Sequence, residues 1–561
     1  MRYILTTAII TLIITQSIFA VPTAYDADIP DNMSAGEYIL GYDPGYVDQT
    51  KDVSSAWVYV GNNTTDNSLL IKQGCTLAAF KNFVIGGNSG GVNNFLTVED
   101  GELSSTNGAA AIFVGYNGGA SNTFIIASDG YVTNSYLSRV GHGAGGNYNS
   151  AVISGGVWRC KYRLYCGENT GSYNQFSVTE GGYFSAAEIR LHVNAGSDYN
   201  KILVSGTNNS GTASSVILSG GLLCGYNGIG AEVKVEKGGY LECVGSTIGR
   251  YGYGHNTVKV DGIGSTWTNL TYINVGWTQK TNSIEVTNGG KVHAVQRIST
   301  GYNGGAGNSI TVDGEGSLMT TDDIQLGHRY ATNNIVTVQN GGKIELTDLF
   351  VISTGASTYG NKVIAKGAGS EISAVSCLVG DVGTYSTLEA SDQATITLAT
   401  ALTIGDDATG NNNSATFSDR DTTASVGSVI YIGLAGSTNT LTIANEALVK
   451  LDGYDIRIDH NGGTNNFLQM QDGYFAWTGS KVSSLTAKES KFKLWNKTTE
   501  EFEIVTDLSA AEKEALNYSI VYYATDEEAK AVTGYDGLGG YTIITGGDNT
   551  TPPEGTLIII Q

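Results

Sequence analysis

Apolar and polar residues alternate along short stretches of this chain, and glycine separates one stretch from the next. In residues 282–286 and 308–312, for example, isoleucine and valine occupy every second position between serine, threonine and glutamate. A period of two is typical of strands that bury one face, whereas a helix would repeat every 3.6 residues. The pattern therefore predicts many short β-strands between residues 51 and 478.

One phrase returns about every 26 residues: an apolar residue and glycine, a polar loop, an asparagine, and two apolar residues one position apart. Ala231 and Ser386 take the place of the asparagine in two copies. A unit this short cannot bury its own apolar residues, but strands that pair with their equivalents in the next copy can do so. We therefore predict an all-β fold, a single-stranded parallel β-helix of about 15–16 coils with three strands in each coil.

The repeated asparagines are predicted to be structural. Asparagine tolerates the left-handed conformation of tight corners, and its amide can both donate to and accept from the asparagine of an adjacent coil. The expected asparagine ladder includes Asn94, Asn122, Asn256, Asn282, Asn308, Asn334, Asn361, Asn439 and Asn466.

The two ends differ from the repeats. Residues 1–20 contain an arginine followed by an apolar run and Ala20, which reads as a secretory signal peptide. Residues 21–50 are expected to form an N-terminal segment or cap, and residues 479–561 a small α+β cap in which Ser509 and Thr525 each begin a helix. No apolar run long enough for a transmembrane helix follows the leader, so we expect no membrane span in the mature chain.

Six cysteines in an exported chain raise the question of disulfides. Cys166 and Cys224 share one position of the repeat, and Cys160 and Cys243 share another, but each pair is separated by more than one coil. A disulfide requires Cα atoms within about 7 Å. Cys160 and Cys166 are the one pair that we consider, and buried free thiols are the favoured interpretation.

Charge and acid spacing bear on function. The net charge of −22 argues against nucleic acid as a partner. The adjacent pairs Asp322–Asp323 and Asp406–Asp407 are the nearest approach to a catalytic acid cluster. Neighbouring residues on a strand point to opposite faces, so neither pair is expected to converge. A groove with three or more charged side chains on consecutive coils would instead favour an enzyme.

No catalytic residue, cofactor or metal site is therefore predicted, with calcium as the one cofactor left open. Its candidate oxygen ligands are Asp26, Asp28 and Asp31, or Asp406 and Asp407 with residues 411–413.

The position that follows the repeat glycine often carries an aromatic residue. Tyr116, Tyr226, Tyr302, His142 and His328 occupy it, and Arg250 takes the same place in another copy. This edge is our candidate for glycan contact, because aromatic rings can pack against sugar rings. Packing within the loops is the competing interpretation.

The repeat phrase, aliphatic-Gly, loop, Asn-x-aliphatic-x-Val and Gly-Gly, is similar to the passenger-type β-helix repeats of autotransporters. It resembles especially the repeats of exported bacterial proteins that carry a PEP-CTERM sorting signal, within the pectin-lyase-like class of solenoids. The resemblance covers residues 57–475 and implies a surface or matrix role without catalytic residues in the motif. The C-terminal end has neither family's anchor, which favours release into the periplasm or beyond.

We therefore expect a secreted or cell-surface protein of a Gram-negative-type bacterium, structural or adhesin-like and without catalytic activity. The alternatives are a polysaccharide lyase or glycoside hydrolase on the same scaffold, and a rod that binds a cell-surface or environmental polysaccharide. Fold analogy alone supports the enzyme.

Overall fold

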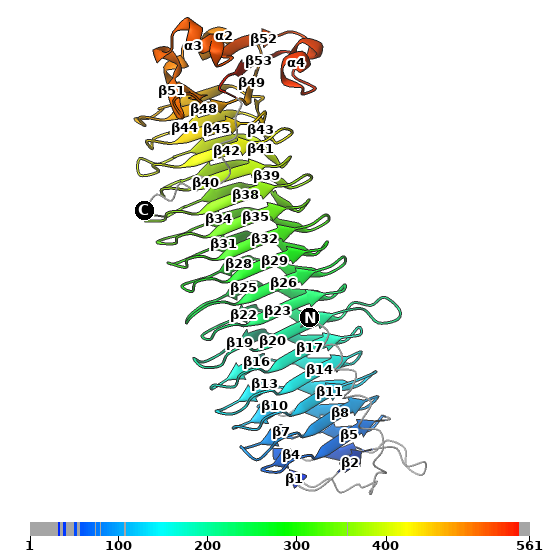
Figure 1. Ribbon diagram of the computed structural model, residues 1–561. Coiled ribbons are helices and arrows are strands. Elements are labelled where there is room, and N and C mark those ends of the chain that lie inside the picture. The colour runs from blue at the N-terminus through cyan, green and yellow to red at the C-terminus, as the bar shows by residue number, and fades with distance from the viewer. Residues whose placement is uncertain are drawn as a thin grey trace. The chain divides into compact units, whose positions relative to one another are not determined.

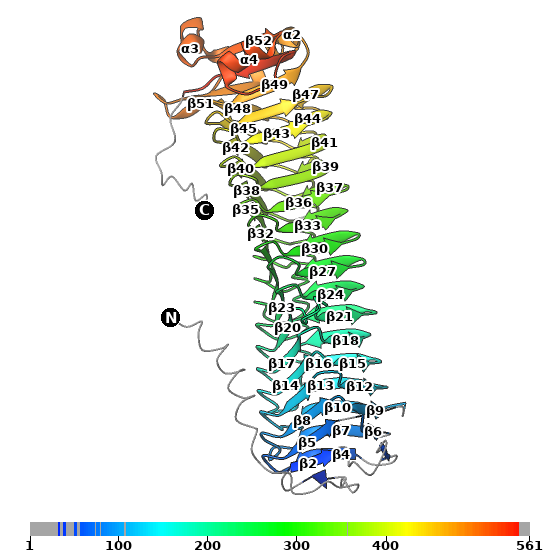
Figure 2. The same cartoon turned by 90° about the vertical axis from the view of Figure 1, so that its right-hand side faces the viewer.

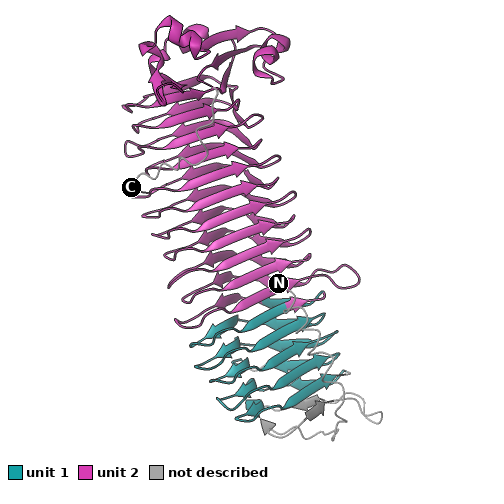
Figure 3. Ribbon diagram, viewed as in Figure 1, with its two compact units in different colours: residues 1–177, 181–185 teal, residues 178–180, 186–561 magenta. Residues whose placement is uncertain are grey.

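A computed structural model describes residues 32–33, 37–40, 50–52, 57–72, 74–78, 80–105, 108–355 and 357–548 (Figure 1). The expected signal peptide and the aspartates at 26, 28 and 31 lie outside these residues. The chain forms a parallel β-helix of about 17 turns, which confirms the predicted fold class. It divides into two compact units, residues 1–177 with 181–185 (unit 1) and residues 178–180 with 186–561 (unit 2), as Figure 3 shows.

Each coil holds three strands, here called first, second and third in the order in which they follow the repeated asparagine. Figure 1 shows third strands of unit 2 stacked in one column, and Figure 2 shows the second strands. All strands within these columns pair in parallel, as Ile284 with Ile310 and Ile298 with Ile324 illustrate.

In unit 1 the first strands are β2 (Glu37–Leu40), β5 (Ser68–Lys72), β8 (Phe95–Glu99), β11 (Thr123–Ile126) and β14 (Ser150–Ser154). The second strands are β3 (Thr50–Asp52), β6 (Thr76–Ala78), β9 (Glu102–Ser105), β12 (Tyr131–Asn134) and β15 (Val157–Cys160). The third strands are β1 (Asn32–Met33), β4 (Trp57–Asn62), β7 (Asn82–Gly87), β10 (Ala111–Tyr116), β13 (Ser138–His142) and β16 (Arg163–Glu168). The division between the units falls within β17 (Gln175–Thr179) and β18 (Tyr183–Ala186).

In unit 2 the first strands are β20 (Lys201–Ser205), β23 (Glu232–Glu236), β26 (Thr257–Asp261), β29 (Ser283–Thr287), β32 (Ser309–Asp313), β35 (Ile335–Gln339), β38 (Lys362–Lys366), β40 (Thr387–Ser391), β42 (Ser414–Ser418), β45 (Thr440–Ala444) and β48 (Phe467–Gln471). The second strands are β21 (Ser215–Leu218), β24 (Tyr240–Cys243), β27 (Thr266–Asn269), β30 (Lys291–Ala294), β33 (Leu318–Thr321), β36 (Lys343–Leu346), β43 (Thr423–Val426), β46 (Leu448–Leu451) and β49 (Tyr474–Thr478). The third strands are β19 (Glu188–Leu191), β22 (Gly221–Cys224), β25 (Gly245–Ile248), β28 (Tyr272–Val275), β31 (Arg297–Thr300), β34 (Asp323–Leu326), β37 (Leu349–Ile352), β44 (Val429–Ile432) and β47 (Asp455–Ile458). Two long strands, β39 (Glu371–Val379) and β41 (Thr395–Ile404), serve as second and third strand together.

The count of coils exceeds the expected 15–16 because pairing begins before the first recognisable repeat. Strands β1, β2 and β3 pair in parallel with β4, β5 and β6, within a segment that the sequence suggested was an N-terminal cap. Their residues lack the asparagine phrase, so the repeat pattern did not reveal them. Backbone pairing needs only an extended neighbour, not the repeat residues.

The interior of each coil is filled by the alternate apolar residues. In the coil that begins at Asn282, Ile284, Val286, Val292 and Ile298 are each at most 1 % exposed. Burying an aliphatic side chain of this size contributes about 1.5–3 kcal/mol, so the alternating pattern is the main source of stability.

The repeated asparagines form a hydrogen-bonded ladder at the corner before each first strand. The side-chain and backbone N–H groups of Asn282 both donate to Asn308 Oδ1, each at 2.9 Å. Equivalent bonds join Asn67, Asn94, Asn122, Asn149 and Asn174 in unit 1, and Asn256, Asn282, Asn308, Asn334 and Asn361 in unit 2. In a second run in unit 2, the backbone N–H of Asn413 donates to Asn439 Oδ1, and the backbone N–H of Asn439 donates to Asn466 Oδ1.

The ladder explains the repeat glycine. A Cβ added to Gly276 would lie 2.3 Å from Asn308 Nδ2, far inside van der Waals contact, and the φ of Gly276 is +70°. The glycine of one coil and the ladder asparagine that packs on it therefore constrain each other.

Where the ladder residue changes, the paired glycine changes as well. Ala231 stands in the ladder where His192 replaces the glycine, and the backbone N–H of Asn200 donates to His192 Nε2 at 2.9 Å. Ser386 stands where Ser353 replaces the glycine, and their hydroxyls lie 2.7 Å apart.

At the end of the ladder, Asp459 replaces the glycine, and its Oδ1 accepts from the side-chain amide of Asn466 at 2.6 Å. At these three places an acceptor on the glycine strand replaces the missing asparagine oxygen.

Beyond β49 the chain forms the cap that the sequence predicts. The helices are α2 (Val482–Thr486), α3 (Ala510–Ala515) and α4 (Asp526–Thr533), with 3-10 turns η1 (Glu489–Lys491) and η2 (Val505–Asp507). The strands are β50 (Phe492–Asn496), β51 (Glu501–Ile504), β52 (Ser519–Tyr523) and β53 (Tyr541–Thr545). Ser509 and Thr525 both cap their helices as expected.

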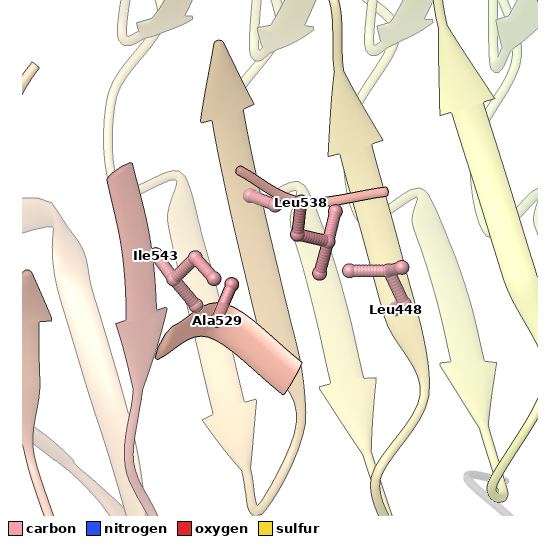
Figure 4. Close-up of a cluster of buried hydrophobic side chains, with 5 residues drawn as sticks. Leu448, Ala529, Leu538 and Ile543 are labelled. Carbon is pink, nitrogen blue, oxygen red and sulfur yellow. The ribbon is translucent and has the colours of Figure 1, made fainter. Parts of the chain in front are cut away.

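The cap closes the free edge of the last coil. Strand β53 pairs antiparallel with β49, so this edge does not offer unpaired backbone groups to another chain. A small apolar cluster of Leu448, Ala529, Leu538 and Ile543 fixes the cap to the coil (Figure 4).

Candidate ligand-binding face

The outward side of the third strands in unit 2 gathers most of the chemistry that departs from the repeat. Alternation along β28, β31 and β34 turns Ile273, Ile298 and Ile324 inward, where each is fully buried. The residues between them point outward and stand in register from coil to coil. We call this surface the third-sheet face; its three columns are Tyr272–Arg297–Asp323, Asn274–Ser299–Gln325 and Trp277–Tyr302–His328.

The column after the repeat glycine contains three of the five predicted glycan-contact residues. Tyr302 and His328 stack with ring centroids 4.7 Å apart and planes 7° apart, and Trp277 packs on Tyr302 at 4.4 Å. His328 Nδ1 also donates to the Tyr302 carbonyl at 3.0 Å. Tyr226 continues the column, with the Arg250 guanidinium 5.5 Å from its ring centre and 5.8 Å from that of Trp277.

This stacking changes how the column can meet a ligand. The sequence suggested that ring faces would be free for sugar, but the rings cover one another's faces along the column. The half-buried rings therefore form a wall that presents edges and polar atoms outward. Trp277 was missed because it does not share the Tyr or His identity of its neighbours, although it occupies the same place after a glycine.

The other two predicted residues, Tyr116 and His142, lie in unit 1. Their rings stack at 5.1 Å with planes 7° apart, and Phe113 packs against Tyr116 at 4.7 Å. His142 Nε2 lies 3.8 Å from a Glu168 oxygen, and burial, the largest influence, lowers the pKa of His142 despite that carboxylate. Tyr116 and His142 are thus joined to their own neighbours, as are Tyr302 and His328 in unit 2.

A cavity of about 530 Å³ opens at the turns between second and third strands of unit 2. This volume falls in the range of small-molecule sites. Its lining comes from four consecutive coils and comprises Tyr272, Gln296, Arg297, Asp322, Asp323, Thr347 and Asp348. Three carboxylates thus face one guanidinium.

The expectation that Asp322 and Asp323 would not converge was wrong. Strand β34 begins at Asp323, so Asp322 belongs to the preceding turn, where the alternation of strand side chains does not apply. Both line the cavity, together with Asp348 from the next coil and Arg297 from the preceding one. The structure therefore contains a groove lined by charged residues from consecutive coils, which the sequence pattern did not reveal.

The carboxylates differ in their surroundings. Asp322 Oδ1 accepts from the Thr347 hydroxyl at 2.5 Å, and Asp323 Oδ1 accepts from the Leu349 N–H at 3.1 Å. Burial raises the pKa of Asp323, and the negative charges of Asp348 and Asp322 raise it further. The hydrogen bond from the Leu349 N–H acts in the opposite direction and lowers it. Arg297 forms no ion pair with another described residue, and its buried Nε has no hydrogen-bond partner in the protein.

The column beside the cavity carries polar atoms without partners. Asn274 is 3 % exposed and Ser299 is fully buried, although both point to the outer side of the sheet, between the flanking columns. Asn274 Oδ1, Ser299 Oγ and Gln325 Oε1 have no hydrogen-bond partner in the protein. Buried polar atoms are normally paired, so this column has unused capacity for hydrogen bonds.

The second acidic pair lies elsewhere in unit 2. Burial, with the charges of Asp406 and Asp407, raises the pKa of Asp381 to about 6. Of the proposed calcium ligands nearby, Asn413 stands in the ladder and Asn411 Oδ1 accepts from the Ser437 N–H. Within the described ranges, no three His, Cys, Asp or Glu side chains are placed to hold a metal ion. Calcium binding, which the sequence left open, is not tested by the structure.

All six cysteines are buried and carry thiols rather than disulfides, as favoured from their positions in the repeat. Burial raises the pKa of Cys243 to about 11 and that of Cys377 to about 12, which makes both thiols unreactive near neutral pH. They fill space in the core.

In the part of the chain that the structure describes, no helix has the length and apolar character needed to cross a membrane. Comparison of the chain with protein-family models, curated proteins and solved structures finds no match. The fold and the third-sheet face are therefore the grounds for a functional assignment.

Proposed function

We propose that the protein is an exported, adhesin-like structural β-helix that holds a polysaccharide on the third-sheet face of unit 2. The resemblance of the repeats to exported passenger-type β-helices supports export and a surface or extracellular location. The observation that carries the ligand is the arrangement of that face, in which the Trp277–Tyr302–His328 wall flanks a column of polar atoms without partners.

Sugar chains suit this arrangement for two physical reasons. Their C–H groups can contact the outward edges of the aromatic side chains, and their hydroxyl groups can form hydrogen bonds with the polar atoms that the wall presents outward. Coil spacing places an aromatic ring on each of three successive coils, so an extended polymer can contact Trp277, Tyr302 and His328 in turn.

Binding to immobilised polysaccharides tests the proposal. Trp277→Ala with Tyr302→Ala should weaken binding by about ten-fold or more, because the wall is lost. Tyr454→Ala is the matched control, since Tyr454 is 84 % exposed and lies outside the column. Equal binding by both variants, or no binding of the unaltered protein to any polysaccharide, would refute the assignment.

The cavity favours a second candidate function, a lyase or glycoside hydrolase. A partly buried carboxyl with a raised pKa, such as that of Asp323, is a feature of general acids, and Asp322 and Asp348 supply further carboxylates. Under the primary proposal, incubation with neutral and acidic polysaccharides releases no new reducing ends or unsaturated products. Release that Asp323→Asn abolishes would instead establish the enzyme.

A further inference from the structure

We propose that unit 1 carries a separate surface that binds a polysaccharide with anionic groups, at the end of β15 and the turn that follows it. The residues of this surface, which we call the cationic edge, are Arg159, Lys161, Tyr162 and Arg163, with Tyr136 from the turn of the preceding coil. The proposal goes beyond the function assigned to the third-sheet face of unit 2 and does not rest on it.

The first ground is a local reversal of charge. The chain has 53 acidic residues and a net charge of −22, but residues 130–167 contain no aspartate or glutamate. The cations of the same stretch are Arg139, Arg159, Lys161 and Arg163. Arg139 pairs with Glu168. Arg159 and Lys161 are exposed and form no ion pair with another described residue. An exposed cluster of one sign attracts ligands of the opposite sign.

The fold fixes the backbone that carries these cations. Alternation along β15 directs Arg159 outward. In the turn, the Lys161 N–H donates to the Asn134 carbonyl at 3.0 Å. The Tyr162 N–H donates to the Tyr136 carbonyl at 3.2 Å. The turn is therefore paired with the coil before it in the same way as the strands, so binding does not have to order a loop first.

The second ground is an exposed aromatic pair beside the cations. The rings of Tyr136 and Tyr162 stack with their centroids 5.7 Å apart and their planes 4° apart, and each residue is 41 % exposed. The Arg163 guanidinium carbon lies 4.4 Å from the Tyr162 ring centre, an arrangement in which the ring attracts the cation. The pair therefore adds ring edges and hydroxyl groups, which suit the C–H groups and hydroxyls of sugars, to the cationic surface.

A polysaccharide fits this edge better than an extended anionic surface does. Arg159, Lys161 and Arg163 belong to one coil, so the cationic surface is small. A membrane or a nucleic acid duplex is wider and would also meet the carboxylates of this acidic chain. A single glycan chain is narrow enough to contact the edge alone, and its sulfate or carboxylate groups can accept paired hydrogen bonds from a guanidinium.

The test compares three dextrans of equal length, which share one sugar backbone and differ in charge. They are neutral dextran, carboxymethyl dextran and dextran sulfate, each immobilised and exposed to the full chain at about 0.15 M salt. We expect both charged dextrans to bind about ten-fold or more tightly than the neutral one. Raising the salt to about 0.5 M should weaken that binding, because salt screens the attraction.

Paired variants separate the cationic edge from other cations of the protein. Arg159→Gln with Lys161→Gln should weaken binding to the charged dextrans by about ten-fold or more. Lys291→Gln with Lys497→Gln removes the same charge from exposed positions in unit 2 and should leave binding unchanged. Far-ultraviolet circular dichroism of both variants checks that the β-helix is retained.

The outcomes decide both the charge and the kind of ligand. Charged dextrans that bind no better than the neutral one, or an equal loss in both variants, would overturn the inference. So would tighter binding of phosphatidylglycerol vesicles or duplex DNA that Arg159→Gln with Lys161→Gln abolishes, since the edge would then fit another class of polyanion. Preference for the sulfated or the carboxymethylated dextran supports the inference and identifies the anionic group.

The third-sheet face is tested separately by Trp277→Ala with Tyr302→Ala. If these changes leave binding to the charged dextrans intact while Arg159→Gln with Lys161→Gln weakens it, the edge binds on its own. If instead the tryptophan and tyrosine changes abolish that binding and the edge variant does not weaken it, the inference fails and the proposed function stands.

Discussion

The pairing of His192 with Ala231 gives the most direct test of how this β-helix is held together. At most coils a glycine packs on the asparagine of a neighbouring coil, and a Cβ on that glycine would clash with the amide. At this place the asparagine is Ala231, and the His192 ring takes the vacant position and accepts the Asn200 N–H at 2.9 Å. Changing both residues, His192→Gly with Ala231→Asn, should restore the ordinary ladder.

The magnitudes follow from the contacts. His192→Gly alone removes the acceptor of a buried N–H, at a cost of about 1–3 kcal/mol, and leaves a gap where the fully buried ring was. Ala231→Asn alone forces an amide against the imidazole, since the equivalent added Cβ elsewhere lies 2.3 Å from the amide. We expect each single variant to lose about 3 kcal/mol and the double variant to regain most of it, a coupling of about 2 kcal/mol or more.

Urea unfolding followed by circular dichroism measures these differences, and the coupling is read from the four proteins of the cycle. Because coils of a solenoid can unfold separately, hydrogen exchange of the peptide that contains Asn200 gives a local readout. Additive losses in the two single variants, with the double variant as unstable as their sum, would refute the link between the glycine and asparagine positions.

Three further predictions use the titration and burial of single groups. Burial lowers the pKa of His192 to about 3, below its value in the unfolded chain, so the contribution of neutral His192 to the unfolding free energy is full above about pH 6.5 and is lost as pH falls toward 3. Between about pH 7.5 and 4.5, urea unfolding should show that the unaltered protein loses about 3 kcal/mol more stability than the His192→Gly/Ala231→Asn variant. The raised pKa of Asp381 shows that the folded state disfavours its charged form, so stability falls as pH rises through about 4 to 6. Asp381→Asn should therefore raise the unfolding free energy by about 1 kcal/mol at about pH 8, after allowance for solvent screening. An equal gain at about pH 4 would contradict this. The six buried cysteines should not react with an aromatic disulfide reagent at about pH 8 until guanidinium unfolds the chain, and rapid labelling of the folded protein would show that the thiols are accessible.

The repeat residues determined the fold on their own. Alternation in segments such as 282–286 can bury one face only if strands pair with their equivalents in other coils, and the regular spacing of asparagine and glycine leaves the parallel β-helix as the solution. The same regularity placed the cysteines inside and Tyr226, Tyr302 and His328 in one column, because a period in sequence becomes a column in space.

The cavity was decided only by the tertiary structure. Asp322 and Asp348 lie at turns, where the direction of a side chain depends on the local backbone and not on alternation, so their meeting with Arg297 of β31 could not be read from spacing. The substitution of His192 for a glycine likewise had no meaning in sequence until Ala231 was seen to pack beside it. A period fixes which residues share a column, but contacts between columns depend on how each turn directs its side chains.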